Sequence, residues 1–158
     1  GSYWTPQNKR TVSSRGVELR CQFSKSVRKF EFHLNGSYTF VQSRVKEGIS
    51  ENDASIGKQL IYVPEHVAKG SLSFYYGDVF LLYQHQFEGM RYISSDNTQA
   101  LPSFQIGRVA LGYDYSFTRH VIGISASLDN IFDAEYQMIA WRPMPGRSFM
   151  INLTYQFK

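Results

Sequence analysis

The side chains that could support catalysis or hold a metal are scattered along the 158-residue chain. The histidines lie far apart in sequence, and none has a metal-ligating partner at short spacing; they are His33, His66, His85 and His120. Ser, His and Asp all occur, but no nucleophile-elbow or related local signature groups them. We therefore expect no catalytic site, no bound metal and no cofactor.

Two further groups of residues have a possible chemistry and a simpler explanation. The acidic stretch EGISENDAS (47–55) could bind Ca²⁺ through Glu47, Glu51 and Asp53, but it does not match a compact calcium loop, so a solvated loop is expected. The single cysteine, Cys21, excludes an internal disulfide and lies among apolar alternating residues, where it is expected to act as a small hydrophobic side chain.

Composition and charge narrow the class of protein. The formal net charge is +4, but the basic residues form no stripe and no nucleic-acid motif is present, so no nucleic-acid partner is expected. Aromatic residues make up 16% of the chain, and abundant Gly with few Pro favours strands and turns. No window of 18 apolar residues exists, so spanning helices are not expected, and no cleavable leader is recognised at the N-terminus.

Period-two alternation predicts an all-β chain, an antiparallel up-and-down meander of about seven strands. The expected strands cover 15–24, 29–43, 66–76, 78–93, 104–117, 119–132 and 146–158. Short turns alternate along the chain with long polar connections at 44–65, 94–103 and 133–145. This asymmetry is typical of a transmembrane β-barrel, which has tight turns at one rim and long external loops at the other.

One face of the expected strands is apolar. In the last strand it comprises Phe149, Ile151, Leu153, Tyr155 and Phe157, and no charge interrupts the equivalent row of the first, second, fifth and sixth strands. A cationic side chain facing mid-bilayer lipid costs about 2–4 kcal/mol, which would enforce this pattern. Aromatic residues gather near the short turns, as in an interfacial girdle. The alternative is a soluble sheet with one buried face.

The fourth strand fits the pattern least well. Its apolar row would place His85 against lipid, unless a bulge at Gly89 shifts the register.

The opposite face of these strands is polar and would line a barrel lumen. The residues expected there are Glu18, Arg20, Glu31, His33, Gln84, Gln86, Glu88, Asp129 and Asn152. They would contact a plug or a passing ligand, or simply meet the requirement of a water-filled interior for polar groups.

Several segments resemble the barrels of TonB-dependent outer-membrane receptors. They are YWTPQN (3–8), RGVEL (15–19), VPEHVAKGSLSF (63–74), SLDNIFDAEYQ (127–137) and, after Trp141, RPMPGRSFMINLTYQF (142–157). The resemblance implies a barrel of about 22 strands with an N-terminal plug. Such a receptor imports a scarce nutrient, for example an iron–siderophore, haem or cobalamin, with energy supplied by the TonB complex. The family commonly ends on an aromatic residue, whereas here Lys158 follows Phe157.

Seven strands cannot close an up-and-down antiparallel barrel, so residues 1–158 are interpreted as the C-terminal portion of such a receptor, without its plug and earlier strands. Its partners would be outer-membrane lipid, the remainder of the receptor, the TonB complex through the absent N-terminal part, and a small-molecule ligand. The alternatives are a self-contained soluble β-sandwich for binding or adhesion, and an outer-membrane barrel enzyme.

Residues of the long connections are the candidates for ligand contact. Aromatic and Arg side chains are frequent binding anchors, and the set expected near the external rim is Trp4, Arg91, Tyr92, Tyr136, Trp141 and Arg142. An aromatic belt or loop packing would explain the same residues.

Overall fold

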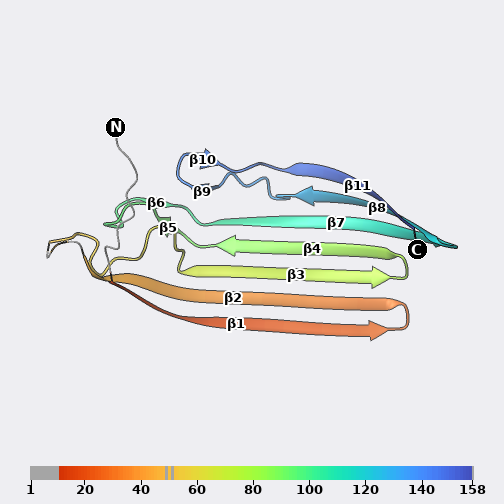
Figure 1. Cartoon of the computed structure of the whole chain (residues 1–158), viewed down its shortest axis with the longest axis horizontal. Coiled ribbons are helices and arrows are strands. Elements are labelled where there is room, and N and C mark those ends of the chain that lie inside the picture. The colour runs from red at the N-terminus through yellow and green to blue at the C-terminus, as the bar shows by residue number, and fades with distance from the viewer. Residues whose placement is uncertain (1–10, 49, 51, 158) are drawn as a thin grey trace.

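The computed structural model describes residues 11–48, 50 and 52–157. Seven strands form one antiparallel sheet in which neighbours in sequence are neighbours in space, apart from short loop strands (Figure 1). In sheet order they are β1 (Thr11–Val27), β2 (Phe30–Glu47), β3 (His66–Tyr76), β4 (Val79–Glu88), β7 (Phe104–Phe117), β8 (His120–Asp129) and β11 (Ser148–Phe157). The described residues contain no helix long and apolar enough to cross a membrane.

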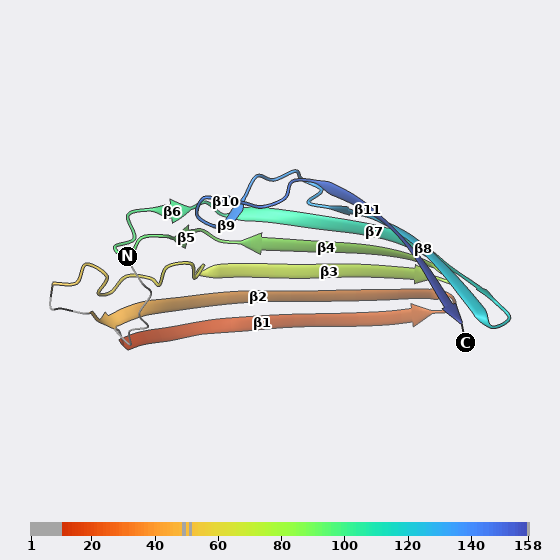
Figure 2. The same ribbon diagram turned by 45° about the horizontal axis from the view of Figure 1, so that its top comes forward.

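The two ends of the sheet differ in the length of their connections. Two-residue turns join β1 to β2, β3 to β4 and β7 to β8 at one end, and each contains a residue with positive φ, namely Arg28, Gly77 and Thr118. At the other end lie the three long connections, two of which contain small ribbons: β5 (Arg91–Tyr92) with β6 (Ala100–Leu101), and β9 (Gln137–Ile139) with β10 (Arg142–Pro143). Figure 2 shows that the sheet twists, with β8 and β11 turned away from β1 and β2.

The predicted meander of seven strands is confirmed, with differences at strand ends. β1 and β2 are longer than expected because they continue to pair with each other beyond the predicted ranges. The fourth strand stops at Glu88 rather than near residue 93, because Arg91 and Tyr92 form β5 and pair with β6 instead of continuing the pairing with β3.

Apart from one shift between Thr11 and Val12, the register is continuous and separates apolar from polar side chains across the sheet. One row of paired residues is apolar: Phe23, Leu34, Leu72, Tyr83, Val109, Leu128 and Phe149. The next row, which points to the other side, is polar: Gln22, Asn35, Ser71, Gln84, Arg108, Asp129 and Ser148. We call the two sides the apolar face and the polar face; side chains alternate between them because the side-chain period of a strand is two.

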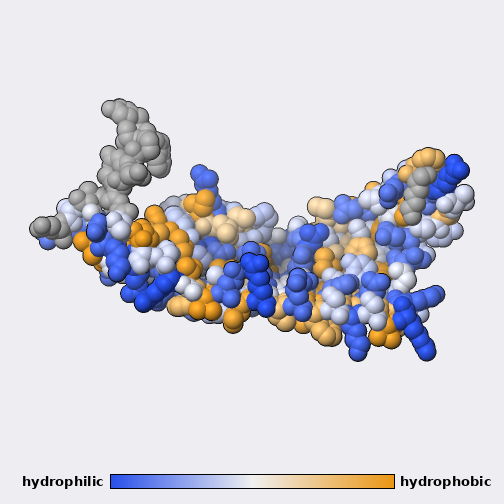
Figure 3. Space-filling view, turned by 60° about the horizontal axis from the view of Figure 1, so that its bottom comes forward, coloured by the Kyte–Doolittle hydropathy of each residue, from blue (hydrophilic) through white to orange (hydrophobic). Residues whose placement is uncertain are grey.

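No second sheet or helix of the described residues packs on the apolar face. Among the described residues the buried apolar side chains are only Val45, Leu101, Phe104 and Ala110, whereas Leu153 on the apolar face is 75% exposed. Apolar side chains accordingly lie at the molecular surface in Figure 3. The described residues form one main sheet and two small ribbons rather than two facing sheets, so the sandwich alternative is wrong.

The expected difficulty at His85 is resolved without a bulge. The register is continuous from β3 through β4 to β7, so His85 does lie on the apolar face, between Gly70 and Gly107. Its Nδ1 is 2.9 Å from the Tyr83 hydroxyl, and its ring contacts Phe132 edge-on at 5.6 Å. A hydrogen-bonded imidazole is a much smaller penalty against lipid than an unpaired one.

Candidate functional site

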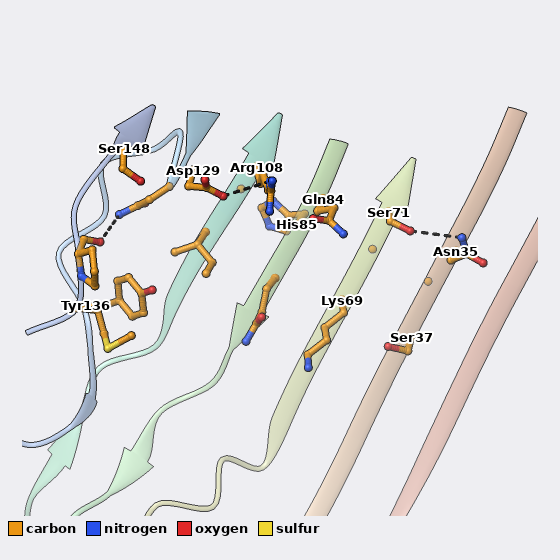
Figure 4. Close-up of a pocket in the computed structure, with 18 of the residues that line it drawn as sticks. Asn35, Ser37, Lys69, Ser71, Gln84, His85, Arg108, Asp129, Tyr136 and Ser148 are labelled. Atoms are coloured by element: carbon orange, nitrogen blue, oxygen red, sulfur yellow. Dashed lines mark hydrogen bonds and ion pairs between the residues drawn. The ribbon is translucent and has the colours of Figure 1, made fainter. Parts of the chain in front are cut away.

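A hollow of about 850 Å³ lies on the polar face. Side chains from neighbouring strands form its floor, and Figure 4 shows them projecting from the ribbons with few bonds between them. Tyr136, Met144 and Pro145 close one side, which means that the connection between β8 and β11 bends over this face. The floor residues are Asn35, Ser37, Lys69, Ser71, Gln84, Gln86 and Arg108.

The charged groups of the hollow are mostly paired. Arg108 lies 3.3 Å from Asp129 on the adjacent strand, and Arg20 lies 2.7 Å from Glu18 on its own strand. Lys69 has no ion-pair partner within the part of the chain that is described. The surface therefore offers amide and hydroxyl groups and one free ammonium, which suits a polar or anionic partner.

All nine residues predicted to line a lumen lie on the polar face by register, although only four line the hollow: Arg20, Gln84, Gln86 and Asp129. His33 lies 3.7 Å from Glu31, and Ser24 contacts its Nδ1 at 3.0 Å. Asn152 pairs with Ser125. That this face is the lumen of a closed barrel stays a prediction.

Arg91 is not the exposed rim residue that the sequence suggested. It is 1% exposed, and its Nη1 lies 2.5 Å from Oε1 of Glu88 at the end of β4. Its Nη2 donates to the carbonyl oxygen of Gln137 in β9 at 2.8 Å. A buried charge needs such partners, so this guanidinium is used within the chain rather than presented to a ligand.

The other predicted loop residues have different environments. Trp141 is 89% exposed at the turn between β9 and β10, where its backbone N–H donates to Oε1 of Gln137 and its φ is 67°. Arg142 is exposed beside it. Tyr136 stacks on Phe104 at 4.4 Å, and Tyr92 is half-buried. Trp4 lies outside the described residues.

Sequence reasoning missed a bond between two of the long connections. Asn97 accepts from the N–H of Gln59 at 2.9 Å and donates to its carbonyl at 3.0 Å, and Oε1 of Gln59 accepts from the N–H of Ser43. The side chain of Ser94 and the N–H and hydroxyl of Thr98 lower the pKa of nearby Asp96 from 3.8 to about 2. The run SSDNT (94–98) indicates a turn, but nothing local indicates its distant partner.

The acidic connection does not assemble a metal site in the described residues. Oε2 of Glu47 accepts from the Thr11 hydroxyl, and Oδ1 of Asp53 accepts from the N–H of Ser55. Glu51 lies outside the described residues. No three His, Cys, Asp or Glu side chains of the described chain are grouped closely enough to hold a metal ion.

Comparison with known proteins matches the chain to one family. The family model "TonB dependent receptor-like, beta-barrel" matches residues 1–131. The ferrioxamine B receptor of Salmonella typhimurium is 32% identical over 134 residues, which cover 79% of this chain and 18% of that protein. The vitamin B12 transporter BtuB of Vibrio cholerae is 27% identical over 146 residues, or 90% of this chain and 22% of that protein.

Solved structures agree on the fold. The ferric citrate transporter FecA in its unliganded form matches with a TM-score of 0.75 at 14% identity, over 92% of this chain and 24% of that one. The ferric yersiniabactin uptake receptor FyuA of Yersinia pestis matches with a TM-score of 0.66 at 19% identity, over 92% and 22%.

The matched proteins are receptors and transporters rather than enzymes, and the chain spans about a fifth of the length of the curated relatives. The alternation of polar and apolar faces, the short and long ends of the sheet and the matches above all agree. The chain therefore belongs to the TonB-dependent receptor-like β-barrel family of outer-membrane proteins.

Proposed function

We propose that residues 1–158 form the C-terminal barrel segment of a receptor that takes up a bulky metal chelate, most simply an iron–siderophore, across the outer membrane. The two-faced sheet carries this proposal. Its exposed apolar face suits contact with lipid, and its polar face with the hollow suits a lumen. The named relatives and structural neighbours take up ferrioxamine B, vitamin B12, ferric citrate and ferric yersiniabactin.

The rest of the receptor would supply what this segment lacks. Seven strands leave β1 and β11 with unpaired edges, which earlier strands of the same barrel would cover. A plug would occupy the lumen and rest against the hollow, where Lys69 could meet one of its carboxylates. Energy would come from the TonB complex through the N-terminal part of the receptor.

Ligand contact from this segment would centre on Trp141. It combines a large aromatic surface with 89% exposure at the end that bears the long connections, and aromatic side chains of this kind dominate many binding sites. Arg142 would add a charge-assisted hydrogen bond to an anionic group of the chelate. Tyr136 would contribute where the hollow opens toward this connection.

The test is uptake by cells that carry the complete receptor as their sole transporter of this kind. Labelled ferric hydroxamate, catecholate and carboxylate chelates are supplied separately, with labelled cyanocobalamin as a further arm. Uptake of at least one ferric chelate is expected, and its affinity should fall about tenfold in Trp141→Ala but little in Trp141→Phe. Uptake of cobalamin alone would replace the proposed substrate, and uptake of none of these ligands would overturn the proposal.

A further inference from the structure

Arg91 contacts residues of three strands besides its own. It belongs to β5, pairs with Glu88 of β4, and donates to the Gln137 carbonyl of β9. Its guanidinium carbon lies 5.1 Å from the centre of the Phe104 ring, at the start of β7. No other described side chain as large is less exposed.

These contacts reach the hairpin that carries Trp141. Nη1 of Arg91 lies 3.5 Å from the sulfur of Met138, and the Phe104 ring beneath the guanidinium stacks on Tyr136. The hairpin is thus attached to the sheet just before its turn, while the one hydrogen bond of Trp141 to another described residue is that of its backbone N–H to Gln137 within the hairpin. The fixed part and the exposed part of the connection are three residues apart.

The chemistry of arginine explains why this position requires it. A planar guanidinium can bond to a carboxylate through one nitrogen and to a carbonyl through another while lying over an aromatic ring. A lysine ammonium could satisfy either oxygen but could not hold both in the same geometry. Glu88 is itself buried, so the pair depends on both members.

We propose that Arg91 is a positioning residue that holds the β9–β10 hairpin against the sheet wall and thereby presents Trp141 in a fixed place. The hairpin is then preorganised rather than a mobile lid, and ligand binding does not have to order it. The benefit for ligand affinity rests on the proposed function, whereas the fixed position of the hairpin does not.

The test measures motion of the hairpin in the complete receptor, reconstituted in lipid without ligand. A nitroxide is attached at Ile139→Cys in a Cys21→Ser background, and a second preparation carries it at Ile61→Cys, in a different connection. Arg91→Lys is compared with Arg147→Lys, which makes the same exchange at an exposed arginine that bonds to other described residues only through its backbone N–H.

Arg91→Lys should raise the mobility of the label at position 139 severalfold and leave the label at 61 unchanged, whereas Arg147→Lys should change neither. The Kd of the labelled ferric chelate that the receptor takes up should rise roughly threefold to tenfold in Arg91→Lys at an unchanged maximal uptake rate. Unchanged mobility at 139, or equal loosening at 61, would overturn the proposal. Failure of both Arg91→Lys and Arg91→Met to assemble would also overturn it, because Arg91 would then be required for barrel folding rather than for hairpin position. If the label at 139 loosens as expected but the complete receptor takes up none of the tested ligands, the hairpin inference stands and only the proposed function fails.

Discussion

A single charge placed on the apolar face should reveal whether that face contacts lipid. Leu153 is the middle residue of the apolar row of β11, which runs from Phe149 to Phe157. Substitution to Arg should strongly destabilise the assembled receptor. The neighbouring change Asn152→Arg is the matched control because Asn152 points to the polar face.

The size of the effect follows from depth in the bilayer. Eight residue steps separate the two ends of the row, which is about 26 Å along the strand and about 20 Å along the membrane normal at a tilt of about 40°. This distance fills most of an apolar band about 25 Å tall, so Leu153 lies close to the bilayer midplane. Arg at that depth costs about 2–4 kcal/mol, whereas Asn152→Arg should cost less than about 1 kcal/mol.

The assay is guanidinium unfolding of the complete receptor in phospholipid vesicles, with heat-modifiable migration on gels as a check of assembly. The difference between the two variants should be at least about 1–3 kcal/mol in the free energy of unfolding. Equal destabilisation by both, or a larger effect of Asn152→Arg, would mean that the faces are assigned the wrong way round or that no lipid covers the apolar one.

Three further outcomes can be tested in the same receptor. Gly16→Ala should lower the free energy of unfolding by about 1–3 kcal/mol, because a Cβ at this position meets a backbone carbonyl of β2. Gly36→Ala should be nearly neutral because the space around Gly36 is open, and the same guanidinium titration measures both variants. The pKa of Asp96 is lowered to about 2, so its ionised form should stabilise the turn fully above about pH 4, and this stability should disappear as the pH falls through about 2. An NMR titration of labelled Asp carboxyls that places the midpoint of Asp96 near 3.8 would contradict this prediction. Asn97→Ala should remove both hydrogen bonds to Gln59 and increase proteolysis of connections 48–65 and 93–99 severalfold, while the midpoint of guanidinium unfolding stays unchanged. A large shift of that midpoint would show instead that these hydrogen bonds stabilise the barrel.

Most of the sheet could be predicted from the local alternation of apolar and polar residues. The apolar and polar rows of β1, β2, β7, β8 and β11 were predictable because each strand repeats the same two environments every second residue. The short turns were predictable as well, since they interrupt the alternation with two polar or glycine residues. Strand ends were less certain, because whether β1 continues to Thr11 depends on a partner strand being there to accept its hydrogen bonds.

The long connections were not predictable in this way. Arg91 has the residue type of a ligand anchor, yet its role depends on Glu88, Gln137 and Phe104 meeting around it. The same limit applies to Asn97 and Gln59, which are 38 residues apart.

Sequence alone thus established the seven strands and, in five of them, which side chains share a face, since contact with one solvent on each side imposes a repeat that is visible within a few residues. The tertiary structure decided which loop residues are buried supports and which, like Trp141, are free to meet a ligand. Burial of a loop side chain depends on contacts with segments that are distant in the chain, and no repeating pattern in the sequence indicates these contacts.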